Sequence, residues 1–89
     1  MARFDFGYAD LHEGTASAVG ADALFQLGLM YSAGRDVEAN LVQAHKWFNL
    51  AAVRGNEDAK HYRMEIARDL TKAEVAKAQR LARQWLSTN

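Results

Sequence analysis

The spacing of helix start and stop signals is the feature that most constrains this chain. The sequence contains no proline, so glycines and capping residues divide it. Gly34 and Gly55 are helix-ending residues, because glycine adopts the left-handed conformation that closes a helix without a steric penalty. These signals predict four helices, over residues 21–33, 41–53, 57–69 or 57–70, and 72–86.

Each of the last three predicted helices follows a capping residue. Asn40 stands three residues before Gln43, the spacing of a capping box, and Asn56 precedes two acidic residues that suit the positive end of a helix dipole. Thr71 and Glu74 form the clearest capping box in the chain. Short loops make successive helices antiparallel neighbours, so the sequence predicts an all-α fold of two stacked helix hairpins.

Apolar residues recur at helical spacing along the predicted helices. Gly28 lies inside the first helix, where glycine costs about 1 kcal/mol of stability relative to alanine. We therefore predict a packing reason, namely a second helix that approaches too closely to leave room for a side chain. Four aromatic residues are expected in the core: Phe25, Tyr31, Trp47 and Phe48. The apolar stripe of the last helix consists of Val75, Ala78, Ala82 and Trp85, with Leu81 alongside.

The composition excludes several classes of protein. With 89 residues the chain forms one small domain, and without cysteine it has neither a disulfide nor a thiolate metal site. The absence of cysteine fits a reducing compartment. The sequence has no apolar run of about 18 residues, and its charged beginning is unlike a signal peptide. We therefore expect a cytoplasmic protein that has no contact with a membrane.

The formal net charge is zero, but the charges are unevenly distributed. Residues 1–58 contain eight acidic and four basic residues, a balance of −4, and residues 59–89 contain three acidic and seven basic residues, a balance of +4. Solvation of surface helices explains this pattern. A basic C-terminal face that meets an acidic partner or nucleic acid is the alternative.

Five stretches between residues 23 and 59 share the spacing of one helical repeat: Ala23-Leu24-Phe25-Gln26-Leu27-Gly28-Leu29-Met30-Tyr31, Gly34-Arg35-Asp36-Val37, Asn40, Ala44-His45-Lys46-Trp47-Phe48 and Ala51-Ala52-Val53-Arg54-Gly55-Asn56. In this pattern they resemble a Sel-one-like repeat, a branch of the tetratricopeptide-type repeats. Asp36 replaces a glycine that this family usually has before the valine. Ala59 restarts the pattern 36 residues after Ala23 (59 − 23 = 36).

Beyond Ala59 the resemblance decays. Arg63 and Met64 replace leucine-glycine, and Ala67 replaces tyrosine. Residues 57–86 therefore resemble a degenerate terminal unit, which caps a repeat array by showing a polar face to water. The resemblance implies a short right-handed α-solenoid over residues 20–89, with the repeat at residues 21–56 and the cap at residues 57–86.

The resemblance implies a scaffold or adaptor, bacterial and cytoplasmic, that binds another protein. In such hairpins the first helix lines a groove. The register turns residues of the first and third helices toward this groove: Asp22, Phe25, Leu29 and Ser32, then Asp58, His61, Glu65 and Arg68. All of these except Asp58 are predicted to bind the partner. An apolar floor with a polar rim is typical of a peptide-binding groove. The alternative is that Phe25 and Leu29 pack against the next hairpin.

Residues 1–19 lie outside the resemblance and are expected to be extended or flexible. They contain Phe4, Phe6 and Tyr8 at alternating positions, which is compatible with a short extended segment. These aromatics are too apolar for a solvated tail. We expect them to fold back into the protein's own groove, to insert into a neighbouring copy, or to dock on a partner. Association between copies would add buried surface to a small core.

No catalytic or cofactor-binding constellation is found. His12, His45 and His61 have no partners at metal-ligand spacing, and we expect His45 to be half-exposed. There is no phosphate-binding glycine loop and no nucleophile motif. We therefore predict no enzyme activity and no cofactor.

Nucleic-acid binding is the runner-up function. Seven basic residues cluster in the last two helices: Lys60, Arg63, Arg68, Lys72, Lys77, Arg80 and Arg83. Phosphate contacts need such charge. The zero net charge and the lack of a base-reading motif argue against it.

Overall fold

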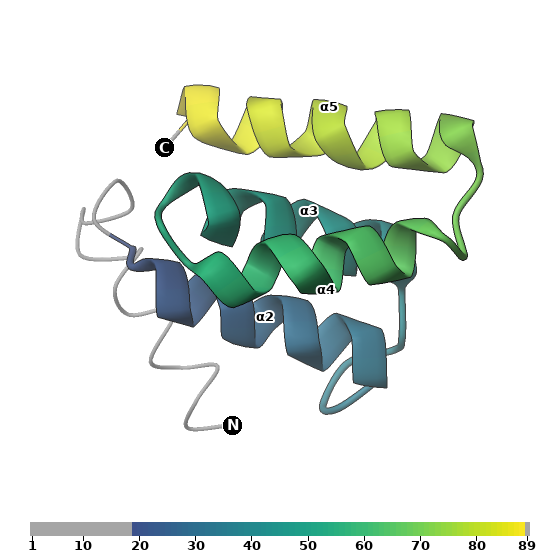
Figure 1. Ribbon diagram of the computed structural model, residues 1–89, viewed down its shortest axis with the longest axis horizontal. Coiled ribbons are helices and arrows are strands. Elements are labelled where there is room, and N and C mark those ends of the chain that lie inside the picture. The colour runs from purple at the N-terminus through teal and green to yellow at the C-terminus, as the bar shows by residue number, and fades with distance from the viewer. Residues whose placement is uncertain (1–18, 89) are drawn as a thin grey trace.

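The computed structural model describes residues 19–88, which form four antiparallel helices (Figure 1). The helices are α2 (Ala21–Ala33), α3 (Leu41–Val53), α4 (Glu57–Ala67) and α5 (Lys72–Thr88). No strand occurs in this range, and the predicted all-α fold of helical hairpins is confirmed. The predictions for Phe4, Phe6 and Tyr8 lie outside the described residues.

The predicted caps of α4 and α5 are confirmed. The Asn56 side chain accepts a hydrogen bond from the backbone N–H of Ala59 at 2.9 Å. Thr71 and Glu74 bond reciprocally: the Glu74 carboxylate accepts from the Thr71 N–H at 2.8 Å, and the Thr71 hydroxyl accepts from the Glu74 N–H at 3.1 Å. Local signals therefore decide where both helices begin, because the first N–H groups of a helix need acceptors outside it.

The cap of α3 forms only half of a capping box. The Asn40 side chain accepts from the N–H of Gln43 at 3.0 Å. The N–H of Asn40 donates to the carbonyl of Tyr31 in α2 at 2.9 Å, so it does not depend on the Gln43 side chain. This bond ties the loop between α2 and α3 to both helices.

Two residues of that loop have a left-handed backbone. Gly34 ends α2 with a φ of 71°, and its N–H donates to the carbonyl of Met30 at 2.8 Å. Asp36 has a φ of 67°. This is the position at which the repeat family usually has glycine. Aspartate tolerates a left-handed conformation better than most residues, so the loop keeps its shape without that glycine.

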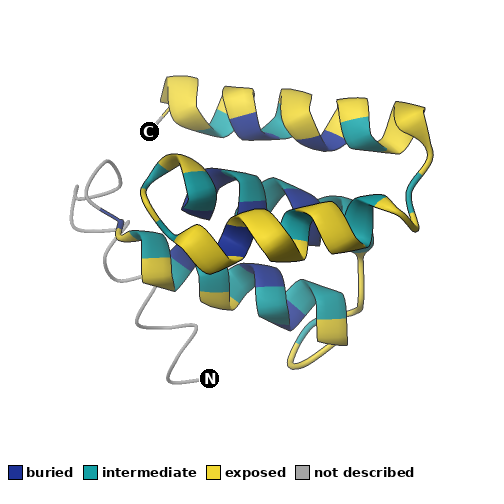
Figure 2. Ribbon diagram, viewed as in Figure 1, coloured by how far each residue is buried: buried dark blue, intermediate teal, exposed yellow. Residues whose placement is uncertain are grey.

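The helix α3 is the centre of the packing. It packs closely against α2, α4 and α5. Its residues Phe48, Leu50 and Ala51 are fully buried, and Figure 2 shows the buried residues gathered on α3 and on the helix faces turned toward it. A Cβ atom at Gly28 would overlap the Phe48 ring. The predicted close approach of a second helix at Gly28 is therefore confirmed.

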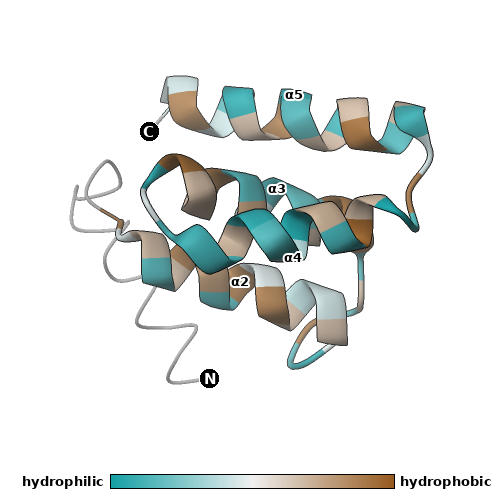
Figure 3. Ribbon diagram, viewed as in Figure 1, coloured by the Kyte–Doolittle hydropathy of each residue, from teal (hydrophilic) through white to brown (hydrophobic). Residues whose placement is uncertain are grey.

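The α4–α5 hairpin is looser than the α2–α3 hairpin. The two helices make few contacts with each other, although both pack on α3. In the repeat register Met64 of α4 takes the place that Gly28 takes in α2. Met64 is 62% exposed, so no other helix packs closely on this position. Figure 3 shows that α4 is mainly hydrophilic on its outer face.

Small residues and one aromatic pair hold α5 on α3. Ala78 and Ala82 are buried. Trp85 packs edge-on against Trp47 of α3, with their ring centroids 5.9 Å apart. The Arg54 guanidinium lies 5.4 Å from the centroid of the Trp85 ring, a cation–π distance. The predicted apolar stripe of this helix is therefore the face that packs.

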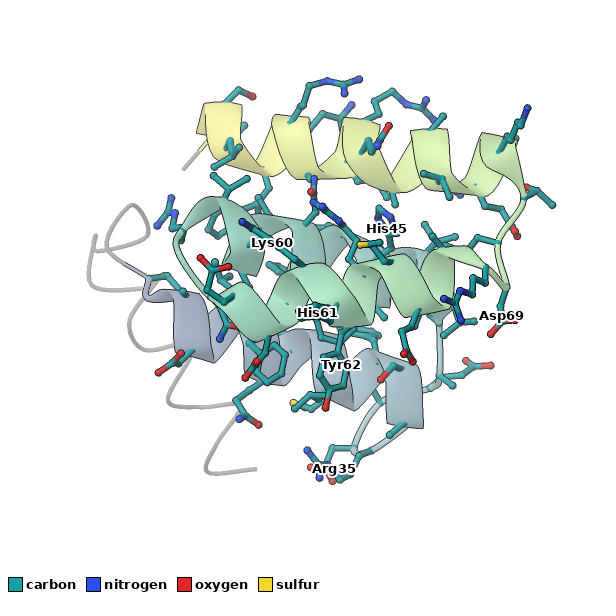
Figure 4. All side chains as sticks on the ribbon, viewed as in Figure 1. Arg35, His45, Lys60, His61, Tyr62 and Asp69 are labelled. Atoms are coloured by element: carbon teal, nitrogen blue, oxygen red, sulfur yellow. The ribbon has the colours of Figure 1, made fainter. Side chains whose placement is uncertain are left out.

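The prediction for His45 is wrong, because this residue is buried with only 3% of its surface exposed. It lies on α3 between α4 and α5 (Figure 4). Its Nδ1 atom has no hydrogen-bond partner among residues 19–88. Burial lowers the pKa of His45, and the nearby Arg63 guanidinium lowers this pKa further. The neutral imidazole is therefore the form that the core accommodates.

We predict that replacing Gly28 by alanine lowers the free energy of unfolding. Overpacking against Phe48 costs about 1–3 kcal/mol, which outweighs the gain of about 1 kcal/mol in helix propensity. Urea unfolding followed by circular dichroism measures the effect. In a double-mutant cycle, Phe48→Leu should recover part of the loss, since it removes the clashing ring edge. A Gly28→Ala chain at least as stable as the wild type would refute the clash.

We predict that His45 makes folding pH-dependent. Its pKa is lowered in the folded chain, so below about pH 6.5, the usual histidine value, the unfolded chain binds a proton that the folded chain excludes. Stability is therefore complete above this pH and falls as the pH drops toward the folded pKa. In urea unfolding between pH 7.5 and 5, the His45→Met variant should lose less stability than the wild type. Equal losses in both chains would show that His45 is not responsible.

Candidate functional site

Two aromatic side chains join α2 and α4, which lie side by side (Figure 1). The rings of Phe25 in α2 and Tyr62 in α4 meet edge-on with centroids 5.2 Å apart. Phe48 of α3 contacts both, at 5.7 Å from Phe25 and 5.4 Å from Tyr62. These three rings, called the ring cluster below, connect the buried core to the surface, since Phe48 is fully buried and Tyr62 is 44% exposed.

A shallow depression of about 260 Å³ lies beside Tyr62. Among the described residues, His61, Tyr62 and Glu65 line it. All three are on α4, and Figure 4 shows His61 and Tyr62 on the side of α4 that faces α2. The structure therefore brings together two of the predicted site residues, His61 and Glu65, at one concave place.

The predicted apolar floor packs as part of the protein itself. Phe25 and Leu29 are partly buried and pack against the core, and Phe25 also contacts Tyr62 of the next hairpin. Phe25 therefore packs between the two hairpins, as the alternative interpretation of the sequence predicts. Substituting either residue would disturb the core as well as the surface.

The remaining predicted residues lie at the two ends of this face. Asp22 accepts a hydrogen bond from the Asn56 side chain at 3.2 Å, which links the beginnings of α2 and α4. The Ser32 hydroxyl donates to the carbonyl of Leu29 at 3.1 Å, so it is engaged by its own helix. Arg68 caps the C-terminal end of α4 and is exposed.

Sequence reasoning missed Tyr62. The repeat register pairs it with Gln26, an exposed position of α2, and so assigns it no part in the groove. One signal was present: Tyr62 is the only Phe, Trp or Tyr between residues 57 and 67. A single aromatic residue in a polar helix is a candidate contact residue, because its ring buries a large apolar area when it packs.

The basic residues of the C-terminal half do not act as one surface. Lys72, Lys77, Arg80 and Arg83 are exposed along α5. Arg63 instead donates to the side chain of Asn49 on α3 at 2.6 Å, and Lys60 forms an ion pair with Glu57 at 3.5 Å. Most of the exposed positive charge that could contact phosphates therefore lies on α5, with Arg68 at the end of α4.

Within residues 19–88, no group of three or more histidine, aspartate or glutamate side chains is arranged to hold a metal ion. None of the four helices is both long and apolar enough to cross a membrane.

The comparison with known families bears on α2 and α3. Residues 21–56 match the Sel1 repeat family, which is the family that the sequence pattern resembles. No curated protein matches the chain, and no solved structure does. The chain therefore contains a Sel1 repeat, formed by α2, α3 and the loop between them.

Proposed function

We propose that this protein is an adaptor that binds another protein and has no catalytic activity of its own. Sel1 repeats typically mediate protein–protein interactions. The observation that carries the proposal is the exposed part of Tyr62, whose ring packs on Phe25 and Phe48 beside a shallow depression. A half-buried tyrosine is a typical anchor for a partner, because its ring offers a large rigid contact and its hydroxyl offers a hydrogen bond.

The proposed contact area, called the α2–α4 surface below, surrounds this ring. It consists of Asp22, Phe25, Leu29, Ser32, His61, Tyr62, Glu65 and Arg68. Phe25 and Leu29 form its floor, and Phe25 packs against the Tyr62 ring. The other side chains form the rim. A rigid floor lowers the entropy that binding must overcome, since the anchor is already oriented.

We predict that Tyr62→Ser abolishes partner binding and that Tyr62→Phe retains most of it, because the ring supplies the main contact. Met64→Ser is the matched control, since Met64 lies on the same helix, is 62% exposed, and is not part of the depression. Each chain is first checked for helicity and melting temperature. It then serves as bait in a lysate of the source cells, and the retained protein is purified and titrated against the same variants.

Three results would contradict the proposal. Loss of binding in Met64→Ser alone would place the contact elsewhere on α4. Retention of the chain itself and of no other protein would favour association between copies. Retention of nuclease-sensitive nucleic acid, lost in a Lys77→Glu/Arg80→Glu variant, would favour the basic face of α5.

A further inference from the structure

The charges around Tyr62 indicate what kind of partner segment would fit. Resting on the proposed function, we infer that the α2–α4 surface binds a segment in which a large apolar residue is flanked by lysine or arginine. The apolar residue would lie in the depression against the Tyr62 ring. The basic neighbours would lie against carboxylates on either side of it.

Two carboxylates flank Tyr62 on its own helix. Asp58 precedes it by four residues and Glu65 follows it by three, and both are exposed. Residues three or four apart lie on the same face of a helix, so a carboxylate stands one turn to each side of the exposed ring. Glu65 also lines the depression. On α2, Asp22 lies three residues before Phe25 and is exposed.

Few cations offset these carboxylates. The helix α2 contains no lysine, arginine or histidine. On α4, Lys60 is paired with Glu57, and Arg63 is turned toward Asn49 of α3. No ion pair among residues 19–88 engages Asp58 or Glu65. The remaining cation of this helix is Arg68, one turn beyond Glu65 at the C-terminal end.

The surroundings of Tyr62 are therefore acidic, although residues 59–89 have a balance of +4. An acidic rim attracts basic groups, and such complementarity raises the association rate and excludes like-charged partners. The electron-rich face of a tyrosine ring also attracts a cation that passes over it.

The size of the depression limits what enters it. Its volume of about 260 Å³ is below the roughly 300–1,000 Å³ of small-molecule sites. It therefore suits one apolar side chain of a peptide better than a metabolite. The rest of such a segment would lie across α2 and α4, where the rim residues Asp22, His61, Glu65 and Arg68 are exposed.

Selection from a random 12-residue peptide library on the immobilised full chain tests this inference. The wild type should enrich peptides in which an aromatic or large aliphatic residue has lysine or arginine neighbours. The charge-reversed variant Asp58→Lys/Glu65→Lys should enrich the same apolar residue with acidic neighbours. Glu38→Lys/Asp69→Lys is the matched control, since both acids are exposed outside this surface, and it should select as the wild type does.

The best wild-type peptide is then titrated against each chain. We expect its affinity to fall at least about tenfold in the charge-reversed variant, since close charge pairs across an interface contribute on this scale. The affinity should also weaken as the salt concentration rises, because salt screens exposed charges. The Glu38→Lys/Asp69→Lys chain should bind within about twofold of the wild type, because its changes lie outside the surface.

Each contrary result has a separate meaning. Neutral or acidic neighbours in the wild-type peptides would overturn the inference and leave the proposed function standing. Peptides whose binding survives Tyr62→Ser would overturn the proposed surface itself. If peptides are enriched only on a chain in which Phe4, Phe6 and Tyr8 are replaced by serine, the ligand of the surface is the chain's own N-terminal segment. If the library enriches no peptide while a purified partner protein still needs Tyr62 for binding, the ligand is a folded surface. That result refutes the peptide inference and leaves the proposed function standing.

Discussion

The contact between Gly28 and the ring of Phe48 determines the arrangement on which the other packing depends. Because Gly28 has no side chain, α3 approaches α2 closely enough for Phe48 to be fully buried. Phe48 then contacts Phe25 and Tyr62, so one close approach in the first hairpin positions an aromatic side chain in the second. The exposed part of Tyr62 is thus held by the core, which is what a preorganised contact surface requires.

The corresponding register position differs in the second hairpin. Met64 occupies the place of Gly28, and α5 packs on α3 with few contacts to α4. The attachment of α5 uses Ala78, Ala82 and the Trp47–Trp85 pair. Since α4 is not covered by α5 in the way that α2 is covered by α3, its outer face is left for water or for a partner. The decay of the repeat pattern after Ala59 is therefore a structural change as well as a loss of resemblance.

The charge counted along the sequence differs from the charge that surrounds Tyr62 in the folded protein. Counted along the chain, the C-terminal third is basic. In three dimensions Arg63 bonds to Asn49, Lys60 pairs with Glu57, and the cations of α5 project from a different helix. The surroundings of Tyr62 are consequently acidic. The sum of charges along a segment predicts the overall field, but a binding surface responds to the charges that remain near it after local pairing.

The sequence alone determined the features that depend on neighbours along the chain. Helix ends at Gly34, Asn56 and Thr71 follow from local hydrogen bonds and backbone preference, so all four helix starts were predictable. The end of α4 lies two or three residues before the predicted end, and the end of α5 lies two residues after it. The close helix contact at Gly28 was also predictable from the sequence. Glycine destabilises the interior of a helix, so its presence there indicates a packing reason.

The tertiary structure decided what covers each helix. His45 is buried because α3 is surrounded by α2, α4 and α5, a fact that the pattern of a single helix does not contain. The repeat register did not predict a role for Tyr62. Its position is set by contacts with Phe25 of α2 and Phe48 of α3. Burial and exposed charge depend on distances between residues far apart in sequence, and only packing determines those distances.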